Sequence, residues 1–193
     1  MNKSLIFIFN APPRSGKDSL FLYLKEKLNI EVHHREFKSK LKEIALICSG
    51  IDKSIWDKRY ELYKDEPWNL LNGLSQREFL MLISEKWIKP ALGKDYFGKN
   101  LASSINEPGV YIVTDGGFSE EILPLTTISN VDIYICQWSR VDSNSNLYTF
   151  DKDSRSYIEE HRTKYKIVYL PTNEDLDTWL EASYRILASY IEL

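Results

Sequence analysis

The chain has 193 residues, 43% of them hydrophobic and 27% charged, with a formal net charge of −3 and a pI of about 5.7. This size suits one α/β domain with its own core, and it is short for two. A mildly acidic chain lacks the basic surface that sequence-independent nucleic-acid binding needs, so we expect no nucleic-acid partner. The apolar runs are too short for a membrane span or a signal-peptide core, so we expect no membrane partner and a cytoplasmic location.

The two cysteines, Cys48 and Cys136, both stand among apolar neighbours. These surroundings predict buried free thiols in a reducing compartment. The cysteines and histidines do not have the spacing of a zinc site.

The apolar residues are patterned as strands that alternate with helices. Residues 4–9 form an apolar run without polar alternation, which is typical of a strand buried on both faces of a parallel sheet. Four further strands are expected at residues 30–37, 110–115, 131–138 and 166–170. Helical spacing predicts helices at residues 18–28, 38–48, 75–89, 96–105, about 153–162 and 172–192, with a short helix or turn at 120–125.

Two of these helices carry finer expectations. Ser75 and Glu78 have the spacing of a capping box, which predicts the start of a helix. Its inward face is expected to consist of Phe79, Leu82, Ile83 and Trp87. The inward face of the last helix is expected to consist of Leu176, Trp179, Leu180, Tyr184 and Leu187.

Strands that alternate with helices indicate a five-stranded parallel sheet covered on both faces, which is a three-layer α/β/α fold. We expect a single domain over residues 1–193. Residues 50–72 are rich in charge and in Trp and Tyr, with a loop expected around Pro67, and they predict a helical insertion that covers about residues 38–105. A fold of this kind binds its ligands at the carboxyl ends of the strands.

The segment APPRSGKDS at residues 11–19 has the features of a phosphate-binding loop. It lies between a predicted strand and a predicted helix, which is the context that the pattern G-x-x-x-x-G-K-[ST] requires. Backbone N–H groups of such a loop and of the following helix converge on phosphate oxygens. The predicted nucleotide-binding set is Pro13, Arg14, Ser15, Gly16, Lys17, Asp18 and Ser19.

Each position in this loop has an expected role. Lys17 supplies a cation to the β- and γ-phosphates of ATP, and Gly16 lets the backbone approach without a Cβ clash. Asp18 stands where a hydroxyl residue is usual, and the Ser19 hydroxyl that follows is expected to hold Mg²⁺ or its water shell. Ala11 replaces the first glycine, so the loop must turn there without a positive φ. A Gly-Lys turn that merely caps a helix is the alternative, and the flanking strand and helix favour phosphate binding.

Asp115 ends a buried strand, where a carboxylate can hold Mg²⁺ through water or position the acceptor of a phosphoryl group. A helix cap for the following segment is the alternative. Phe37 and Lys38 follow the second strand, at the edge where an acceptor monophosphate would lie. Phe37 also fits a place in the core.

Phosphoryl transfer depends on positioning and on neutralising charge, so further cations are needed. The candidates are Arg14, Arg77, Arg140 and Arg155, although a single arginine is more often a solvated surface residue. Arg140 and Arg155 lie at the two ends of a polar segment rich in Ser and Asn, and we expect residues 139–156 to form a lid over ATP.

Several segments together resemble the deoxynucleoside monophosphate kinases of tailed phages, within the P-loop kinases of nucleoside monophosphates. They are PPRSGKDS (12–19), FKSKLKEIA (37–45), LSQREFLMLISEKWIKPALGKDYFGKNLA (74–102), VYIVTDGGFSEE (110–121), Trp138-Ser139-Arg140, DSRSYI (153–158) and IVYLPTNEDLDTWLEASYRIL (167–187). The resemblance follows nearly the whole chain in order.

This resemblance implies phosphoryl transfer from ATP to a nucleoside or deoxynucleoside monophosphate. It implies that Lys17, Ser19, Arg14 and Asp115 bind ATP with Mg²⁺, that Lys38 and Arg77 hold the acceptor phosphate, and that Arg140 and Arg155 close from the lid. Analogy with P-loop kinases gives the strand order 2-3-1-4-5. A phage gene would place the protein in the host cytoplasm, and a homodimer is left open.

Two alternatives remain at this point. One is a P-loop kinase for another small molecule, such as a cofactor precursor. The other is a catalytically degenerate protein that binds or senses a nucleotide. Ala11 and the lack of a cation in residues 116–120, where adenylate kinase carries an arginine, favour the degenerate protein, whereas Lys17 and Asp115 disfavour it.

Overall fold

The computed structural model describes residues 3–151, 155–161 and 164–191. Its five parallel strands are β1 (Ser4–Asn10), β2 (Val32–Arg35), β3 (Val110–Val113), β4 (Val131–Gln137) and β5 (Lys166–Tyr169). They form one sheet in the order β2-β3-β1-β4-β5, which is the order given by analogy with P-loop kinases.

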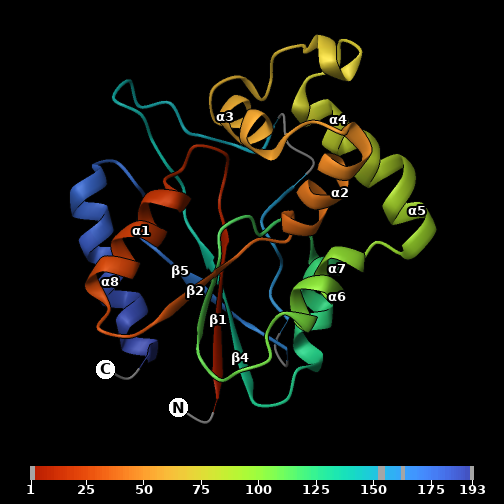
Figure 1. The fold of residues 1–193 in the computed structure, drawn as a ribbon. Coiled ribbons are helices and arrows are strands. Elements are labelled where there is room, and N and C mark those ends of the chain that lie inside the picture. The colour runs from red at the N-terminus through yellow and green to blue at the C-terminus, as the bar shows by residue number, and fades with distance from the viewer. Residues whose placement is uncertain (1–2, 152–154, 162–163, 192–193) are drawn as a thin grey trace.

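Strand β1 is the centre of the sheet because every one of its residues is buried. Phe7 and Phe9 belong to the core shared with α1 (Lys17–Lys27) and α8 (Leu176–Ile191), whereas Ile6 and Ile8 belong to the core on the opposite face. Figure 1 shows α1 and α8 together on one side of the sheet, and the other helices on the opposite side. This arrangement confirms the predicted α/β fold with helices on both faces.

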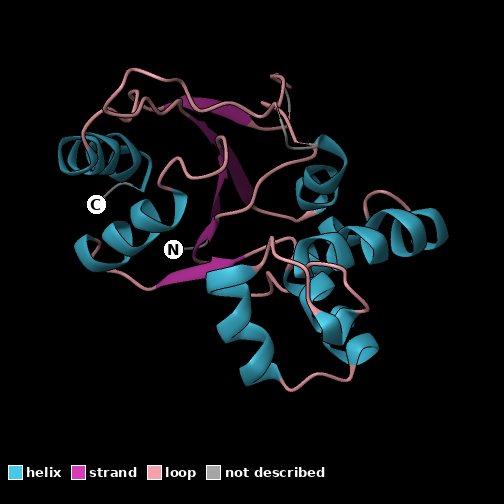
Figure 2. Cartoon of the chain, turned by 90° about the horizontal axis from the view of Figure 1, so that it is seen from above, coloured by secondary structure: helices cyan, strands magenta, loops and turns pink. Residues whose placement is uncertain are grey.

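The second face is covered by helices that lie mostly between β2 and β3 in the chain. These are α2 (Ser39–Ser49), α3 (Lys53–Tyr63), α4 (Gln76–Ile83), α5 (Lys89–Leu92) and α6 (Tyr96–Ser103), with a 3-10 turn at Asn69–Leu71. After β3 come α7 (Ser119–Ile122) and a 3-10 turn at Leu123–Thr127. Seen from above, α3 to α5 extend beyond the edge of the sheet (Figure 2).

Helix α4 begins with the predicted capping box: the Ser75 hydroxyl accepts from the backbone N–H of Glu78, and the Glu78 carboxylate accepts from the N–H of Ser75. The predicted inward face is only partly right. Ile83 is buried and Phe79 partly so, but Leu82 and Trp87 are about half exposed, while Leu80 and Ile88 face inward.

A π-helical turn at Ser84–Ile88 joins α4 to α5 and explains the shift at its end. Such a turn adds one residue to a helical repeat, so positions after it rotate relative to the α-helical pattern. Ile88 therefore takes the inward place expected for Trp87. Before the turn, Gln76 Nε2 donates to the Trp56 carbonyl (2.9 Å), which fixes the side of α4 on which Leu80 lies.

Three further expectations need correction. Cys136 is buried but Cys48 is exposed, because α2 turns it away from the core. Leu176 is also exposed, since it is the first residue of α8. Residues 155–161 are not helical; the ends of two strands hold this segment by hydrogen bonds. Residues 153, 154 and 162, also in the predicted helix, lie outside the described part.

No helix in the described ranges is long and apolar enough to cross a bilayer.

Candidate functional site

The loops that follow β1, β2 and β3 border a cavity of about 370 Å³. Most of the predicted site residues line it: Pro13, Arg14, Lys17, Asp18, Phe37, Lys38, Arg77, Asp115 and Arg155. Ser15, Gly16, Ser19 and Arg140 are not among its lining residues. The cavity therefore joins the predicted phosphate loop to the helices α3, α4 and α5 on the other side.

The predicted phosphate loop is folded tightly around Lys17. The Lys17 ammonium group donates to the carbonyl oxygens of Ala11 (2.7 Å) and Pro12 (2.6 Å), so its side chain lies across the loop. Positive φ values in the loop occur at Arg14 (61°) and Gly16 (95°) and not at Ala11. Because Ala11 is also buried in the core, the loop accommodates the residue that replaces the first glycine.

Side chains from the segments that follow β4 and β5 hold this loop in place. The Ser15 carbonyl accepts from Trp138 Nε1 (2.9 Å) and from Asn173 Nδ2 (3.1 Å). A Cβ on Gly16 would stand 3.0 Å from the same Asn173 amide, so glycine is needed there for space as well as for its φ. The buried Ser15 hydroxyl has no hydrogen-bond partner among the residues described.

Asp115 clamps the turn after β2. Its carboxylate oxygens accept from the backbone N–H groups of Phe37 (2.8 Å) and Lys38 (2.9 Å), which are far away in the chain. It therefore holds the turn just before α2 and does not cap the segment that follows it. Burial raises the pKa of Asp115, although the Lys38 cation and these two N–H groups oppose the rise. A role in metal binding stays a prediction.

Lys38, Lys64 and Arg77 bring three cations to the wall of the cavity. Burial lowers the pKa of Lys64, and repulsion from Arg77 and Lys38 adds to this effect. Burial alone would also lower the pKa of Lys38, but the carboxylates of Asp115 and Glu36 outweigh it and raise that pKa. Cations that repel one another in this way would be stabilised by a bound anion.

Arg155 lies over the turn that follows β3. Its Cδ and Cγ atoms lie 2.5 and 2.7 Å from where a Cβ on Gly117 would be, so the side chain fits there because residue 117 is glycine. Residues 116–120 contain no cation, but the fold places Arg155 against them from a segment about forty residues later in the chain.

The residues just after Arg155 are fixed to the sheet. Asn10 donates to the Ser156 carbonyl (2.9 Å) and accepts from the N–H of Ile158 (2.8 Å), and Gln137 donates to the Ile158 carbonyl (2.8 Å). The carboxyl end of the predicted lid is thus anchored at the ends of β1 and β4. Mobility of the segment stays a prediction, and residues 152–154 lie outside the described part.

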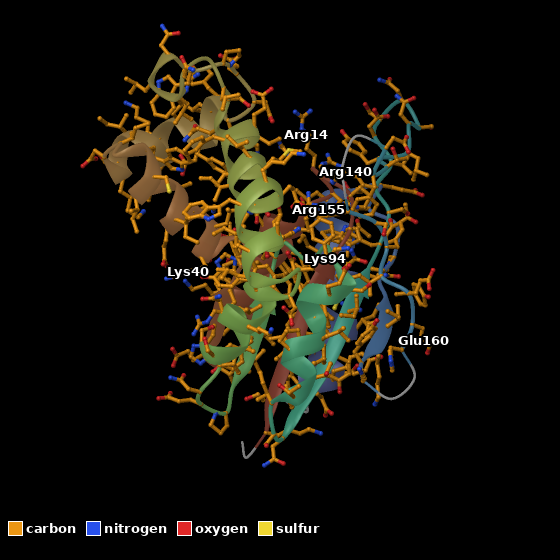
Figure 3. The ribbon with its side chains drawn as sticks, turned by 90° about the vertical axis from the view of Figure 1, so that its right-hand side faces the viewer. Arg14, Lys40, Lys94, Arg140, Arg155 and Glu160 are labelled. Carbon is orange, nitrogen blue, oxygen red and sulfur yellow. The ribbon has the colours of Figure 1, made fainter. Side chains whose placement is uncertain are left out.

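Arg140 lies beside the predicted phosphate loop without lining the cavity. It donates to the Arg14 carbonyl, and its guanidinium carbon is 5.0 Å from the centre of the Tyr148 ring. Figure 3 shows Arg14, Arg140 and Arg155 near one another toward the upper end of the strands. The structure thus brings these three predicted arginines to one region.

The wall of the cavity also holds a group of side chains that the sequence did not mark. Glu121 of α7 is 7% exposed, Lys89 of α5 is 12% exposed, and 4.0 Å separates Nζ of Lys89 from Oε1 of Glu121. Lys89 also pairs with Glu85 at 2.7 Å and lies 4.1 Å from the centre of the Phe118 ring. Burial raises the pKa of Glu121 to about 8, against the opposing effect of Lys89.

The sequence held a sign of one of the missed residues. Tyr60 of α3 and Lys64, the residue that caps its carboxyl end, are four residues apart, which places them on the same side of the helix. No pattern marks Glu121, because an acidic residue in a short polar segment is normally exposed.

No group of three or more His, Cys, Asp or Glu side chains within the described residues has the arrangement of a metal site. Two carboxylates line the cavity together with Lys17. Asp18 belongs to the predicted phosphate loop, and Asp115 follows β3.

No protein-family model and no curated protein matched the sequence. Among solved structures, a gluconokinase from Sinorhizobium meliloti 1021 is 15% identical with a TM-score of 0.43, covering 99% of this chain and 94% of that chain. An uncharacterized protein from Eubacterium ventriosum ATCC 27560 is 15% identical with a TM-score of 0.38, covering 98% and 99%. At this level of similarity, the function must be argued from the residues of this chain.

Proposed function

We propose that the protein transfers the γ-phosphoryl group of ATP to a nucleoside or deoxynucleoside monophosphate. The observation that carries this proposal is the shared cavity, whose wall includes the predicted phosphate loop, three cations on the side of the helical insertion, and Arg155. A protein that only bound ATP would have no use for a second group of cations across the same cavity.

On the donor side, the N-terminus of α1 and the loop before it would hold the ATP phosphates. Lys17 would exchange its carbonyl partners at Ala11 and Pro12 for the β- and γ-phosphate oxygens. Arg155, held against Gly117, would neutralise charge on the transferred phosphoryl group. This supplies the cation whose absence from residues 116–120 favoured a degenerate protein.

On the acceptor side, Lys38, Lys64 and Arg77 would bind the monophosphate. Asp115 contributes by fixing the backbone of Phe37 and Lys38, and thereby the position of the Lys38 side chain. Because phosphoryl transfer requires little covalent chemistry from the protein, holding the two phosphates in line is the main task of these residues.

Mg²⁺ fits the same wall. It is commonly held by one or two carboxylates together with substrate phosphates; Asp18 lines the cavity for this, and Asp115, whose oxygens already accept from the N–H groups of Phe37 and Lys38, would hold the ion through water. The ion would neutralise charge on the β- and γ-phosphates. Ser19, which does not line the cavity, is a weaker candidate than the sequence indicated.

The proposal is tested by coupled ADP release over all nucleoside and deoxynucleoside monophosphates, with gluconate and other non-nucleotide acceptors in the same panel. Turnover with at least one monophosphate, dependent on Mg²⁺, is the expected result. Turnover with a non-nucleotide acceptor alone would favour the broader group of small-molecule kinases. Tight ATP binding without turnover on any acceptor would favour the degenerate binding protein.

A further inference from the structure

The cavity wall contains a buried acid whose ion pair is longer than a hydrogen bond. Glu121 is 7% exposed and lines the cavity, and its Oε1 lies 4.0 Å from Nζ of Lys89. Burying a carboxyl group costs free energy, which a ligand with N–H or O–H donors at hydrogen-bond distance would recover.

Lys89 supplies a second polar group next to Glu121. Its ammonium nitrogen is held by Glu85 (2.7 Å) and lies over the Phe118 ring. Lys89 Nζ lies 4.0 Å from Glu121 Oε1, so a hydrogen-bond donor, the ammonium group, lies next to an acceptor, the carboxylate.

The rest of this part of the cavity is apolar and aromatic. Lining side chains include Phe37, Leu80, Met81, Phe97 and Phe118. Apolar walls with a few polar groups at one end suit a flat ligand that has apolar faces and a polar edge. A nucleobase has this shape, whereas a polyhydroxylated sugar acid would leave many hydroxyl groups unpaired.

We propose that Glu121 and Lys89 recognise the base of the acceptor, and that the preferred acceptor is a guanine nucleotide. This inference rests on the proposed function, because it identifies the substrate of the same site.

Guanine matches this pair better than the other bases. Its pairing edge carries two adjacent donors, the N1–H and the 2-amino group, next to the O6 acceptor. A carboxylate has two oxygens that can accept from both donors, and an ammonium group can donate to O6. Adenine and cytosine offer one amino group beside a ring acceptor, and thymine offers one N–H between two carbonyls.

The protonation state of Glu121 offers a second test of this proposal, the release of a proton when guanine binds. The groups that act on its charge are Lys89, Asp115, Glu85 and Glu120, and burial raises its pKa to about 8. The carboxyl group is therefore mostly protonated at pH 7 in the empty cavity. Two N–H donors stabilise the ionised form, so guanine binding at pH 7 should release a proton.

The decisive experiment compares guanine with hypoxanthine, which lacks only the 2-amino group. Wild type and Glu121→Gln are assayed for kcat/KM and for binding with dGMP, dIMP, GMP and IMP. Wild type should favour guanine over hypoxanthine by about tenfold or more, and Glu121→Gln should reduce the ratio to about twofold or less. Glu120→Gln removes the same charge from an exposed neighbour on α7 and should keep the wild-type ratio.

The other outcomes separate the two proposals. Turnover with a preferred base other than guanine, or an unchanged guanine-to-hypoxanthine ratio in Glu121→Gln, would overturn this inference and leave the kinase function standing. Failure of wild type to bind or phosphorylate any monophosphate would overturn the proposed function itself.

A measurement on the wild-type protein alone covers the case in which Glu121→Gln does not fold. Calorimetry of dGMP binding at pH 7 in two buffers of different ionisation enthalpy should show proton release, and dIMP should release less. Equal proton release with both nucleotides, or none, would contradict the role of Glu121.

Discussion

Gly98 of α6 lies directly against the backbone of Glu121 in α7. A Cβ on Gly98 would stand 2.0 Å from the Glu121 carbonyl oxygen and 2.9 Å from its Cα, so the two helices can approach this closely only with glycine. This contact places α7 where the Glu121 side chain faces the cavity.

Gly98→Ala should therefore destabilise the protein. An alanine normally stabilises a helix interior relative to glycine, but here it would force α6 and α7 apart, at a cost of about 1–3 kcal/mol. Urea denaturation measures the change in the free energy of unfolding. Lys99→Ala, on an exposed position of the same helix, should change it little. A neutral or stabilising effect of Gly98→Ala would contradict the packing described here.

Lys17→Ala should lower kcat by about 100-fold or more, because a cation that contacts the transferred phosphoryl group would be lost. Its side chain bridges loop carbonyls and does not belong to the core, so the urea midpoint should stay close to wild type. The matched control is Lys25→Ala, on an exposed position of α1, which should retain activity. Near-normal turnover of a folded Lys17→Ala protein would exclude the phosphate-loop assignment.

Arg155→Ala should reduce kcat more than it raises KM for either substrate. The guanidinium group would act mainly on charge in the transition state, where such arginines contribute about 10³-fold or more. Steady-state kinetics with ATP and the best monophosphate give this comparison. Arg185→Ala on α8, where Arg185 pairs with Glu181 outside the cavity, is the control. If Arg155→Ala changed kcat no more than Arg185→Ala does, Arg155 would be an ordinary surface residue.

Arg77→Ala should raise KM for the acceptor by about 10-fold to 100-fold and leave KM for ATP nearly unchanged, since Arg77 would contact only the monophosphate. It pairs with Asp65 at the rim of the cavity, and an exposed pair of this kind contributes little to stability. Lys58→Ala, on an exposed position of α3, serves as the control. A larger effect on ATP than on the acceptor would reverse the assignment of the two sides.

Glu121→Gln should also change how stability depends on pH. The pKa of Glu121 is about 8 in the folded protein against an ordinary value of 4.5, so the folded state binds this proton more tightly. Its contribution to stability is complete below about pH 4.5 and is lost as the pH rises through about 8. Relative to wild type, the free energy of unfolding of Glu121→Gln should rise between pH 5 and pH 9. Glu120→Gln should not show this rise, and parallel profiles for wild type and Glu121→Gln would contradict the raised pKa.

The amino-acid sequence alone determined the five parallel strands and predicted a phosphate loop at residues 11–19. Both depend on local patterns: apolar runs of strand length, and a Gly-Lys pair between a strand and a helix. The same local reasoning was wrong where packing decides which residues are buried. Leu82 and Trp87 are exposed because a π-helical turn and the contact with Trp56 set the face of α4, and neither can be seen in the spacing of apolar residues.

Only the tertiary structure decided how residues distant in the chain form the candidate site. Asp115 holds the backbone of Phe37 and Lys38, and Arg155 lies over Gly117 because Asn10 anchors the segment that follows it. Each of these contacts depends on the order of the strands and on space beside a backbone, which local sequence does not encode. The physical reason is that helical and strand periodicity record which side of one element is apolar, whereas a binding site is made by the polar ends of several elements brought together.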